Sequence, residues 1–326
     1  MRSKTDPSGS DRSTEFCGAI LAAGMGSRIR PLSLSLPKPL LPVCNKPIIQ
    51  YQIEEMKRIG ITDIYIVIGH LKNKIRAVLK DGSQLGVRIT YVEQKEMLGI
   101  AHAVGQLENH IQKPFLLWLG DIYFIPQHIE QLIDTHRSKK ASAVLAVKKE
   151  PDFNLLKKNY AVLLDDAGRV QRVFEKPRYL LNNLKGCGIY FFDLTIFDAI
   201  RRTPRTAMRD EYEITTAIQI LLEDGAAVYP AEVVAWDMNV TFATDLLACN
   251  RRQLERLGEN KVIGAGCKIH ASAQIINSVI GPRVKIKHPI TVTDSTILEG
   301  VSWNSKKDIR SCLVTRNEVF EATTHV

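Results

Sequence analysis

Leu21-Ala-Ala-Gly24-Met-Gly26-Ser27-Arg28 is the stretch around which this chain is organised, and it runs on to Pro37-Lys38. It follows the apolar, strand-like residues 16–20. A loop of small residues after a buried strand can turn its backbone N–H groups toward an anion. Arg28 and Lys38 add positive charge to the loop. The stretch therefore predicts a phosphate-binding loop at the end of a first buried strand.

The two glycines alone would also fit a tight turn from a strand into a helix. The loop lacks the Walker pattern and the Gly-x-Gly-x-x-Gly spacing, so neither a P-loop nor a dinucleotide fingerprint fits. Arg28 lies two residues past Gly26, and Pro37-Lys38 closes the polar loop. The whole string therefore favours phosphate binding over a plain turn.

Strand-like and helix-like segments alternate after this loop. Apolar periodicity predicts helices at residues 48–58, 71–79 and 101–111, and strands at residues 63–68, 87–92 and 114–119. This βαβ alternation predicts an α/β fold with a doubly wound, mostly parallel, Rossmann-like sheet. Ligands of such sheets bind beyond the carboxyl ends of the strands, where Gly24–Lys38 and Gly120-Asp121 both fall.

The pattern shifts toward strands after a predicted helix at residues 127–139. Strands are predicted at residues 141–147, 160–164, 170–175, 186–192 and 233–238, and helices at residues 213–222 and 242–257. Asp165-Asp166-Ala167-Gly168 joins two of these strands as a hairpin turn. This second half is expected to complete the same domain.

A third pattern begins near Asn260. Apolar residues recur about every six positions, with one five-residue step, at Ile263, Ile269, Ile275, Ile280 and Ile286. Hexads of this kind predict a parallel β-helix, and the regularity is expected to stop after His288. An irregular β-rich tail is the alternative. The predicted domains are a disordered tail over residues 1–15, a nucleotide-binding domain over residues 16–258 and a β-helix over residues 259–326.

Composition narrows the class of protein. The 326 residues are 45% hydrophobic, enough for one large core and a second, smaller one. No apolar run reaches the roughly 18 to 20 residues of a membrane span, so we expect a soluble, cytoplasmic protein with no membrane contact. The net charge of +9 is spread along the chain, which favours a polyanionic small substrate over nucleic acid. Six scattered cysteines predict neither disulfides nor a structural metal.

The loop Gly24-Met-Gly26-Ser27-Arg28 with Pro37-Lys38 resembles the signature of the sugar-1-phosphate nucleotidylyltransferases, in particular the glucose-1-phosphate thymidylyl- and uridylyltransferases. The resemblance implies transfer of a nucleotide from dTTP or UTP to a sugar 1-phosphate, release of pyrophosphate, and a Mg²⁺ cofactor. The hexads resemble the left-handed β-helix tail of some members, which implies a homo-oligomer. The resemblance also implies catalytic roles for Arg28, Lys38 and Lys176, and nucleotide contacts at Leu21, Ala23, Gly24, Gly26, Ser27, Gln94 and Gly99.

Two positions match the metal ligands of this family. Asp121 follows an apolar strand and Gly120, as the family's Gly-Asp does. Counting back from Asp245-Leu246-Leu247 places the second ligand at Asn239, and Asp237 is the alternative. An asparagine offers an oxygen but no charge, so it is expected to bind Mg²⁺ more weakly than an aspartate.

The remaining matches divide between the base and the acceptor. Gln94 matches the glutamine that reads the base, and its carboxamide complements the donor and acceptor of uracil or thymine. Glu175-Lys176-Pro177 matches a motif whose glutamate accepts sugar hydroxyls and whose lysine holds the sugar phosphate. His102 is expected to have no catalytic role. The substrate-binding residues implied on the acceptor side are Ala161, Glu175, Gly186 and Glu213.

The acceptor half departs from the family's pattern. Ala161 replaces a glycine, Gly186 replaces an asparagine and Thr216 replaces an aspartate. The acceptor is therefore either a sugar 1-phosphate, a cyclitol phosphate or another phosphorylated alcohol. A subunit that binds nucleotide sugars without turning them over is the non-enzymatic alternative.

Overall fold

A computed structural model describes residues 15–157, 159–179, 182–207 and 210–322, so the tail predicted over residues 1–15 falls almost wholly outside this range. The described chain forms two compact units. The first comprises the residues up to Gly24, Gln52–Gly120 and Phe124–Asp237. The second comprises Met25–Tyr51, Asp121–Tyr123 and the chain from Met238 onward. The units therefore interleave in sequence.

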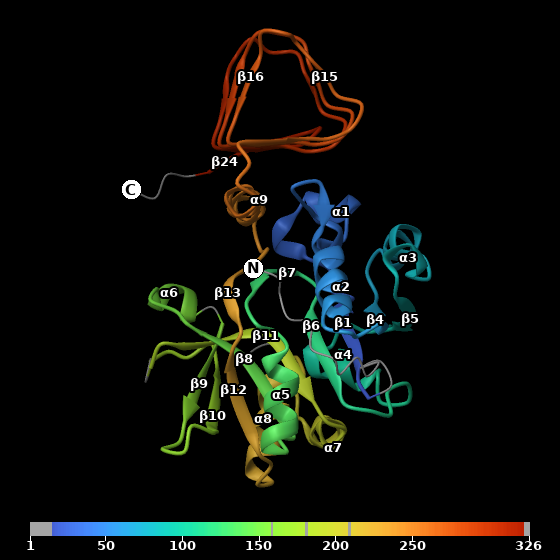
Figure 1. The fold of residues 1–326 in the computed structure, drawn as a ribbon, viewed down its shortest axis with the longest axis vertical. Helices are drawn as coiled ribbons and strands as arrows, with labels where there is room; N and C mark the ends of the chain where they lie inside the picture. The colour runs from blue at the N-terminus through green and yellow to red at the C-terminus, as the bar shows by residue number, and fades with distance from the viewer. Residues whose placement is uncertain (1–14, 158, 180–181, 208–209, 323–326) are drawn as a thin grey trace, which may run out of the picture. The chain divides into compact units, whose positions relative to one another are not determined.

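A nine-stranded sheet forms the frame of the first unit (Figure 1). Its strands are β1 (Cys17–Ala22), β4 (Asp63–Ile68), β5 (Arg88–Glu93), β6 (Phe115–Leu119), β8 (Ala143–Lys149), β9 (Tyr160–Leu164), β10 (Val170–Glu175), β11 (Leu184–Phe192) and β12 (Val228–Glu232). The main path runs β10-β9-β11-β6-β1-β4-β5, and β8 pairs with both β11 and β12. The predicted α/β class is confirmed.

The sheet is mixed in direction. β6, β1, β4 and β5 are parallel neighbours, as the βαβ alternation predicts. β11 runs antiparallel to β6, β8 and β9. The hairpin turn between β9 and β10 forms as predicted, with Gly168 at a φ of 74°.

Helices cover both faces of the sheet. They are α2 (Ile48–Arg58), α3 (Lys72–Leu79), α4 (Ile100–Gly105), α5 (Gln131–Lys139), α6 (Phe153–Leu156), α7 (Thr195–Arg202) and α8 (Ile214–Glu223). Neighbouring strand residues point to opposite faces. Phe192 packs in a core cluster with Phe197 of α7 and Ile218 of α8, whereas Phe191 meets His136 of α5 with 4.7 Å between ring centroids. The first unit is therefore layered on both sides, as in a doubly wound fold.

Several elements differ from the sequence prediction, which also missed α7 and the short elements α6 and β7 (Ile122–Pro126). The helix predicted over residues 101–111 ends at Gly105 and continues as turns. The helix predicted from residue 127 begins only at Gln131, because His128 adopts a left-handed φ of 54° that interrupts a helix. β12 was not predicted. Its Pro230 has no backbone N–H to donate and is tolerated because β12 pairs only with β8.

The second unit contains the turn-rich segment after Gly24. This segment holds the 3₁₀ turns η1 (Ser27–Ile29) and η2 (Lys38–Leu40), the short helix α1 (Leu32–Ser35) and the hairpin of β2 (Pro42–Val43) with β3 (Lys46–Pro47). β7 (Ile122–Pro126) and β13 (Val234–Asn239) pair as a two-stranded sheet, and only Ile122-Tyr123 and Met238-Asn239 of these strands belong to the second unit. α9 (Ala243–Leu257) follows in the second unit.

Stacked short strands form a parallel β-helix at the end of the chain, with a triangular outline in Figure 1. They are β14 (Lys261–Ile263), β15 (Lys268–Ile269), β16 (Gln274–Ile276), β17 (Ser278–Ile280), β18 (Lys285–Ile286), β19 (Thr291–Thr293), β20 (Thr296–Ile297), β21 (Ser302–Trp303), β22 (Ile309–Arg310) and β23 (Cys312–Val314). An antiparallel strand, β24 (Val319–Glu321), ends the stack on β23. The predicted β-helix is confirmed.

The coil of this β-helix has 17 residues instead of three full hexads. Ile263 pairs with Ile280, and Ile280 pairs with Ile297, in the same parallel sheet. The five-residue step seen once in the sequence therefore recurs in every coil. The expectation that regularity stops after His288 is wrong, because Val292 and Trp303 occupy positions where earlier coils have isoleucine.

No helix in the described ranges has the length and apolar character needed to cross a membrane.

Candidate active site

The glycine loop leaves β1 as an exposed turn. Ala23 is fixed at the strand end, where its carbonyl accepts a hydrogen bond from His70 N at 3.0 Å. A β-carbon at Gly24 would meet no atom within 4 Å, so the backbone there is open to a ligand. Gly26 has a left-handed φ of 62°, and a β-carbon there would lie 3.0 Å from Lys38 Cγ. Gly26 therefore meets two conditions that favour glycine, a positive φ and a close neighbour.

Lys38 and Asp121 form an ion pair in the second unit. Lys38 Nζ lies 3.1 Å from Asp121 Oδ2. The lysine side chain is only 7% exposed, whereas the aspartate is 36% exposed. The Lys38 side chain is thus buried, whereas the Asp121 carboxylate with which it pairs is still accessible to solvent. Two of the residues predicted to handle phosphate and metal are brought together here.

Asn239 ends β13 beside the same aspartate. The backbone carbonyl of Asp121 accepts a hydrogen bond from Val240 N at 3.1 Å. Asn239 Oδ1 is buried, and within the described ranges it has no hydrogen-bond partner. Buried polar atoms are rarely left without one, so this oxygen is suited to a ligand.

The donor set fits a Mg²⁺ ion, which prefers carboxylate and amide oxygens. Asp121 and Asn239 would supply one oxygen of each kind. In the part of the chain that the structure describes, no three His, Cys, Asp or Glu side chains gather into a metal-binding group. An ion held by Asp121 and Asn239 would therefore keep positions for water or substrate oxygens.

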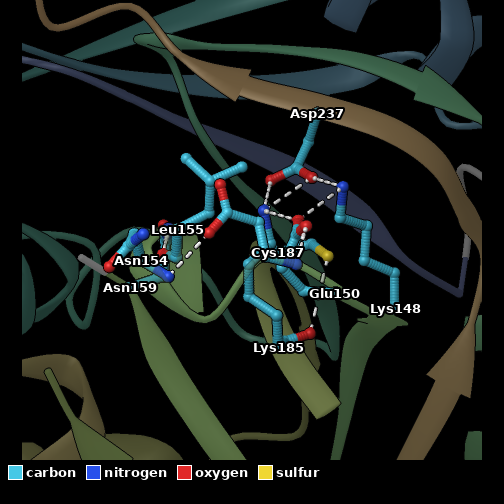
Figure 2. Close-up of polar contacts among 9 residues, drawn as sticks. Lys148, Glu150, Asn154, Leu155, Asn159, Lys185, Cys187 and Asp237 are labelled. Atoms are coloured by element: carbon cyan, nitrogen blue, oxygen red, sulfur yellow. Dashed lines mark hydrogen bonds and ion pairs between the residues drawn. The ribbon is translucent and has the colours of Figure 1, made fainter. Parts of the chain in front are cut away.

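Asp237, the alternative metal ligand, is engaged elsewhere. Lys185 Nζ donates to both of its carboxylate oxygens, at 2.8 and 2.7 Å, and Lys148 Nζ lies 3.0 Å from Oδ1 (Figure 2). Glu150 Oε2 lies 3.1 Å from Lys148 Nζ, which completes a cluster of two cations and two anions. Asp237 therefore neutralises lysines, and Asn239 is the better candidate for the metal.

Attraction between the opposite charges of this cluster offsets the unfavourable free energy of burying them. Burial by itself lowers the pKa of Lys148, but the Asp237 and Glu150 carboxylates outweigh it and the pKa is raised. The cluster joins β8, β11 and β13 through side chains distant in the sequence, and no sequence motif signalled it.

Gln94 is buried in the first unit and contacts His102. Gln94 Nε2 donates to Gly99 O at 3.3 Å and lies 2.9 Å from His102 Nδ1. His102 Nε2 in turn lies 3.3 Å from Gln106 Nε2. Only one nitrogen of a neutral imidazole accepts a hydrogen bond, so only one of the two amide nitrogens donates to the ring, and the tautomer of His102 decides which one. His102 was expected to be a bystander; its position beside Gln94 could not be seen in the sequence.

Gly99 lets the segment after Gln94 approach the segment of Tyr212 closely. Its φ is 111°, and a β-carbon there would lie 2.6 Å from Tyr212 O and 2.7 Å from Tyr212 N. Tyr212 N donates to Leu98 O at 2.7 Å. Glu213, the next residue, is buried at the start of α8. The structure thus joins the predicted base-reading segment to the segment of Glu213.

Glu175 and Lys176 follow each other at the end of β10. Glu175 Oε2 accepts a hydrogen bond from the Thr215 hydroxyl at 3.3 Å. Lys176 has a left-handed φ of 45°, and its amide donates to Asn159 O at 2.9 Å. Non-glycine residues with positive φ are uncommon and cluster at functional sites. Thr215 is therefore a hydrogen-bond partner of a predicted acceptor residue that sequence reasoning missed.

Tyr160 explains why residue 186 is a glycine. A β-carbon at Gly186 would lie 1.8 Å from Cζ of the Tyr160 ring. That ring stacks on Tyr190, with centroids 6.1 Å apart, and burial raises the pKa of both phenols. Ala161 is buried and pairs with Lys185 of β11. An aromatic ring therefore fills the space into which an asparagine side chain would point.

Comparison with known proteins agrees with this geometry. The profile of the family described as nucleotidyl transferase matches residues 17–238, more than half of the chain. The chain belongs to the nucleotidyl transferase family. A second profile, described as GlmU-like C-terminal hexapeptide, matches residues 248–326 and covers the β-helix of this nucleotidyltransferase.

Curated relatives of this nucleotidyltransferase carry related names. The low-salt glycan biosynthesis nucleotidyltransferase Agl11 of Haloferax volcanii is 37% identical over 243 residues, which cover 73% of this chain and 66% of that relative, just under two thirds of its length. The glucose-1-phosphate thymidylyltransferase of Streptomyces antibioticus is 33% identical over 81% of this chain and 76% of its own.

Solved structures show the same fold. A protein from Bacillus anthracis described as a glucose-1-phosphate thymidylyltransferase, in complex with sucrose, matches with a TM-score of 0.65 and 27% identity. The match covers 72% of this chain and 94% of that one. A UDP-glucose pyrophosphorylase complexed with UDP-glucose matches with a TM-score of 0.64, and at 22% identity it supports the fold alone.

Proposed function

We propose that this nucleotidyltransferase couples dTTP or UTP to a sugar 1-phosphate and releases pyrophosphate, with Mg²⁺ as its cofactor. The observation that carries the proposal is the pairing of Lys38 with Asp121 at 3.1 Å, together with the buried oxygen of Asn239, which has no hydrogen-bond partner among the residues that the structure describes. The names of the relatives support the sugar 1-phosphate as acceptor.

Each predicted residue has a task in this reaction. The exposed backbone at Gly24 and Gly26, with Arg28 and Lys38, would hold the triphosphate. Asp121 and Asn239 would hold Mg²⁺, which when bound neutralises charge on the phosphates. Gln94 would read the base. Glu175 and Lys176 would hold the acceptor.

The chemistry needs alignment more than proton transfer. An oxygen of the acceptor phosphate attacks the α-phosphorus, and the bond from that phosphorus to the bridging oxygen of the β-phosphate breaks. Pyrophosphate leaves with the electron pair. The nucleophile is already an anion, so no general base is required. Lys38 and Arg28 would lower the barrier by offsetting negative charge around the α-phosphorus.

Pyrophosphate release tests the proposal. The purified chain is incubated with Mg²⁺, each nucleoside triphosphate in turn and a panel of sugar 1-phosphates. We expect dTTP or UTP with a hexose 1-phosphate to give the fastest release. An absence of turnover together with tight binding of nucleotide sugars would contradict the proposal and favour a non-catalytic subunit.

Substitutions test the assigned roles. Lys38→Ala and Asp121→Asn should each lower kcat/KM by at least about a hundredfold, because the first removes a positive charge near the reacting phosphates and the second removes the negative charge that would hold Mg²⁺. Lys74→Ala, on the exposed face of α3, is the matched control and should retain wild-type turnover. Near-normal turnover of Lys38→Ala would refute its role.

A second candidate acceptor is favoured by one observation, the Tyr160 ring beside Gly186. It removes the space for an amide that would contact a hexose. The acceptor would then be a cyclitol phosphate or another phosphorylated alcohol. The same panel, extended to these acceptors, distinguishes the two candidates by their kcat/KM values.

A further inference from the structure

α9 carries two buried amides on one face. Asn250 and Gln253 are 1% and 4% exposed and lie three positions apart, so they point to the same side of the helix. A buried amide destabilises a protein unless it is hydrogen-bonded. Both amides find their partners in segments that carry residues of the candidate active site.

Asn250 holds the hairpin that follows Lys38. Its Oδ1 accepts a hydrogen bond from Cys44 N at 2.8 Å, and its Nδ2 donates to Pro42 O at 3.2 Å. Cys44 and Asn45 form the hairpin turn with positive φ values of 46° and 65°. This turn lies six residues beyond Lys38, so Asn250 fixes the chain on which Lys38 sits.

Gln253 holds the strand that follows Asp121. Its Oε1 accepts a hydrogen bond from the hydroxyl of Tyr123, two residues past Asp121. The Tyr123 ring also packs edge-on against Tyr51, with centroids 5.2 Å apart, and Tyr51 OH donates to Val43 O at 2.9 Å. The two segments are thus joined to each other as well as to α9.

We propose that Asn250 and Gln253 are positioning residues, through which α9 keeps Lys38 and Asp121 in register for phosphate and metal. This inference rests on the proposed function. Neither amide is expected to touch substrate, and groups one step removed from metal ligands commonly tune metal affinity.

Gln253→Met and Tyr123→Phe break the same hydrogen bond from its two ends. Mn²⁺ binding is followed by electron paramagnetic resonance in the presence of whichever triphosphate the wild type accepts, without acceptor. We expect each single variant to bind Mn²⁺ about tenfold more weakly. The double variant should lose less than the sum of the two single losses, because both substitutions remove the same bond.

Asn250→Leu should raise KM for the triphosphate several-fold, and Asn250→Asp, which keeps the acceptor for Cys44 N, should recover part of that loss. Arg251→Ala, on the exposed side of α9, is the control and should match the wild type. If Gln253→Met fails to fold, Tyr123→Phe still tests the bond by removing one oxygen.

Variants that melt earlier but bind Mn²⁺ and triphosphate like the wild type would overturn the inference, and so would additive losses in the double variant. A wild type that binds neither Mn²⁺ nor triphosphate would refute the proposed function together with this inference. Normal wild-type binding with unaffected variants would refute the inference alone.

Discussion

Asn239 offers a neutral oxygen at a position where members of the nucleotidyl transferase family commonly have a carboxylate. Its carbonyl oxygen is buried and, within the described ranges, has no hydrogen-bond partner. Because affinity for a hard cation rises with the charge of its ligands, this single residue should limit how tightly the metal binds. The prediction that Asn239 is a metal ligand can therefore be tested in both directions.

Asn239→Asp should bind Mn²⁺ several-fold more tightly than the wild type and lower the Mg²⁺ concentration needed for half-maximal turnover. The added carboxylate is buried, so the same variant should melt earlier in the absence of metal. Asn239→Ala removes the oxygen and should therefore bind the metal more weakly than the wild type. Titration of both variants checks this, and equal affinities would show that residue 239 does not ligate the metal.

Cys17 gives a prediction about alkaline pH. Burial in β1 raises the pKa of this thiol from 9.0 to about 12. Between these two values the unfolded chain loses the proton and the folded chain keeps it. The free energy of unfolding should therefore be unaffected below pH 9 and fall as pH rises toward 12, by up to about 1.4 kcal/mol per pH unit for this thiol.

Urea unfolding at pH 8, 9 and 10 measures this slope, and Cys17→Ala supplies the comparison. The variant should be less stable at pH 8, because it loses packing, but its stability should fall less steeply above pH 9. Identical slopes in the two proteins would contradict the assignment to Cys17.

At the scale of elements, β8, β11 and β13 are held together by the cluster of Lys148, Glu150, Lys185 and Asp237 (Figure 2). Backbone hydrogen bonds between strands can form in more than one register. These four side chains meet in only one register, so their contacts favour the observed one. Removing one member of a buried ion pair leaves a charge without compensation, which costs far more than losing an exposed pair.

Asp237→Asn should lower the free energy of unfolding by about 3 to 5 kcal/mol, since two buried ammonium groups would then face Glu150 alone. Arg169→Ala breaks the exposed pair with Asp165 and should cost less than about 1 kcal/mol. Thermal melts of both variants make the comparison. Similar losses would show that the cluster is effectively solvated.

At the scale of the whole molecule, the described chain has separate apolar cores. One lies between the nine-stranded sheet and α4, α7 and α8 in the first unit. Another fills the β-helix, where Ile280, Ile297 and Val314 stack in successive coils. Such a chain need not unfold in one step, because each core can be lost by itself.

Ile297→Ala opens a cavity in the β-helix core, so it should lower the free energy of unfolding of the β-helix by about 2 to 5 kcal/mol. In calorimetry, the transition of the β-helix should therefore move to a lower temperature. A second transition, from the sheet of the first unit, should stay in place. Leu34→Ala, at an exposed position, is the control and should leave both transitions unchanged. A single transition that moves as a whole would show that the cores unfold together.

Much of this molecule followed from local patterns. Apolar alternation and period predicted β1, β4, β5 and β6, and the hexads from Ile263 predicted the β-helix, because each pattern records which side of one element is buried. The match of Gly24-Met-Gly26-Ser27-Arg28, Lys38 and Asp121 to a family motif predicted the nucleotidyltransferase. These features lie within short stretches, so the sequence by itself determined them.

Only the tertiary structure decided which distant residues meet. It placed His102 against Gln94, gave Asp237 to two lysines, set the Tyr160 ring over Gly186 and brought Asn250 and Gln253 behind the segments of Lys38 and Asp121. The physical reason is that strand order and register bring together side chains far apart in the chain. A local pattern shows that a residue is buried, but not which partner it is buried against.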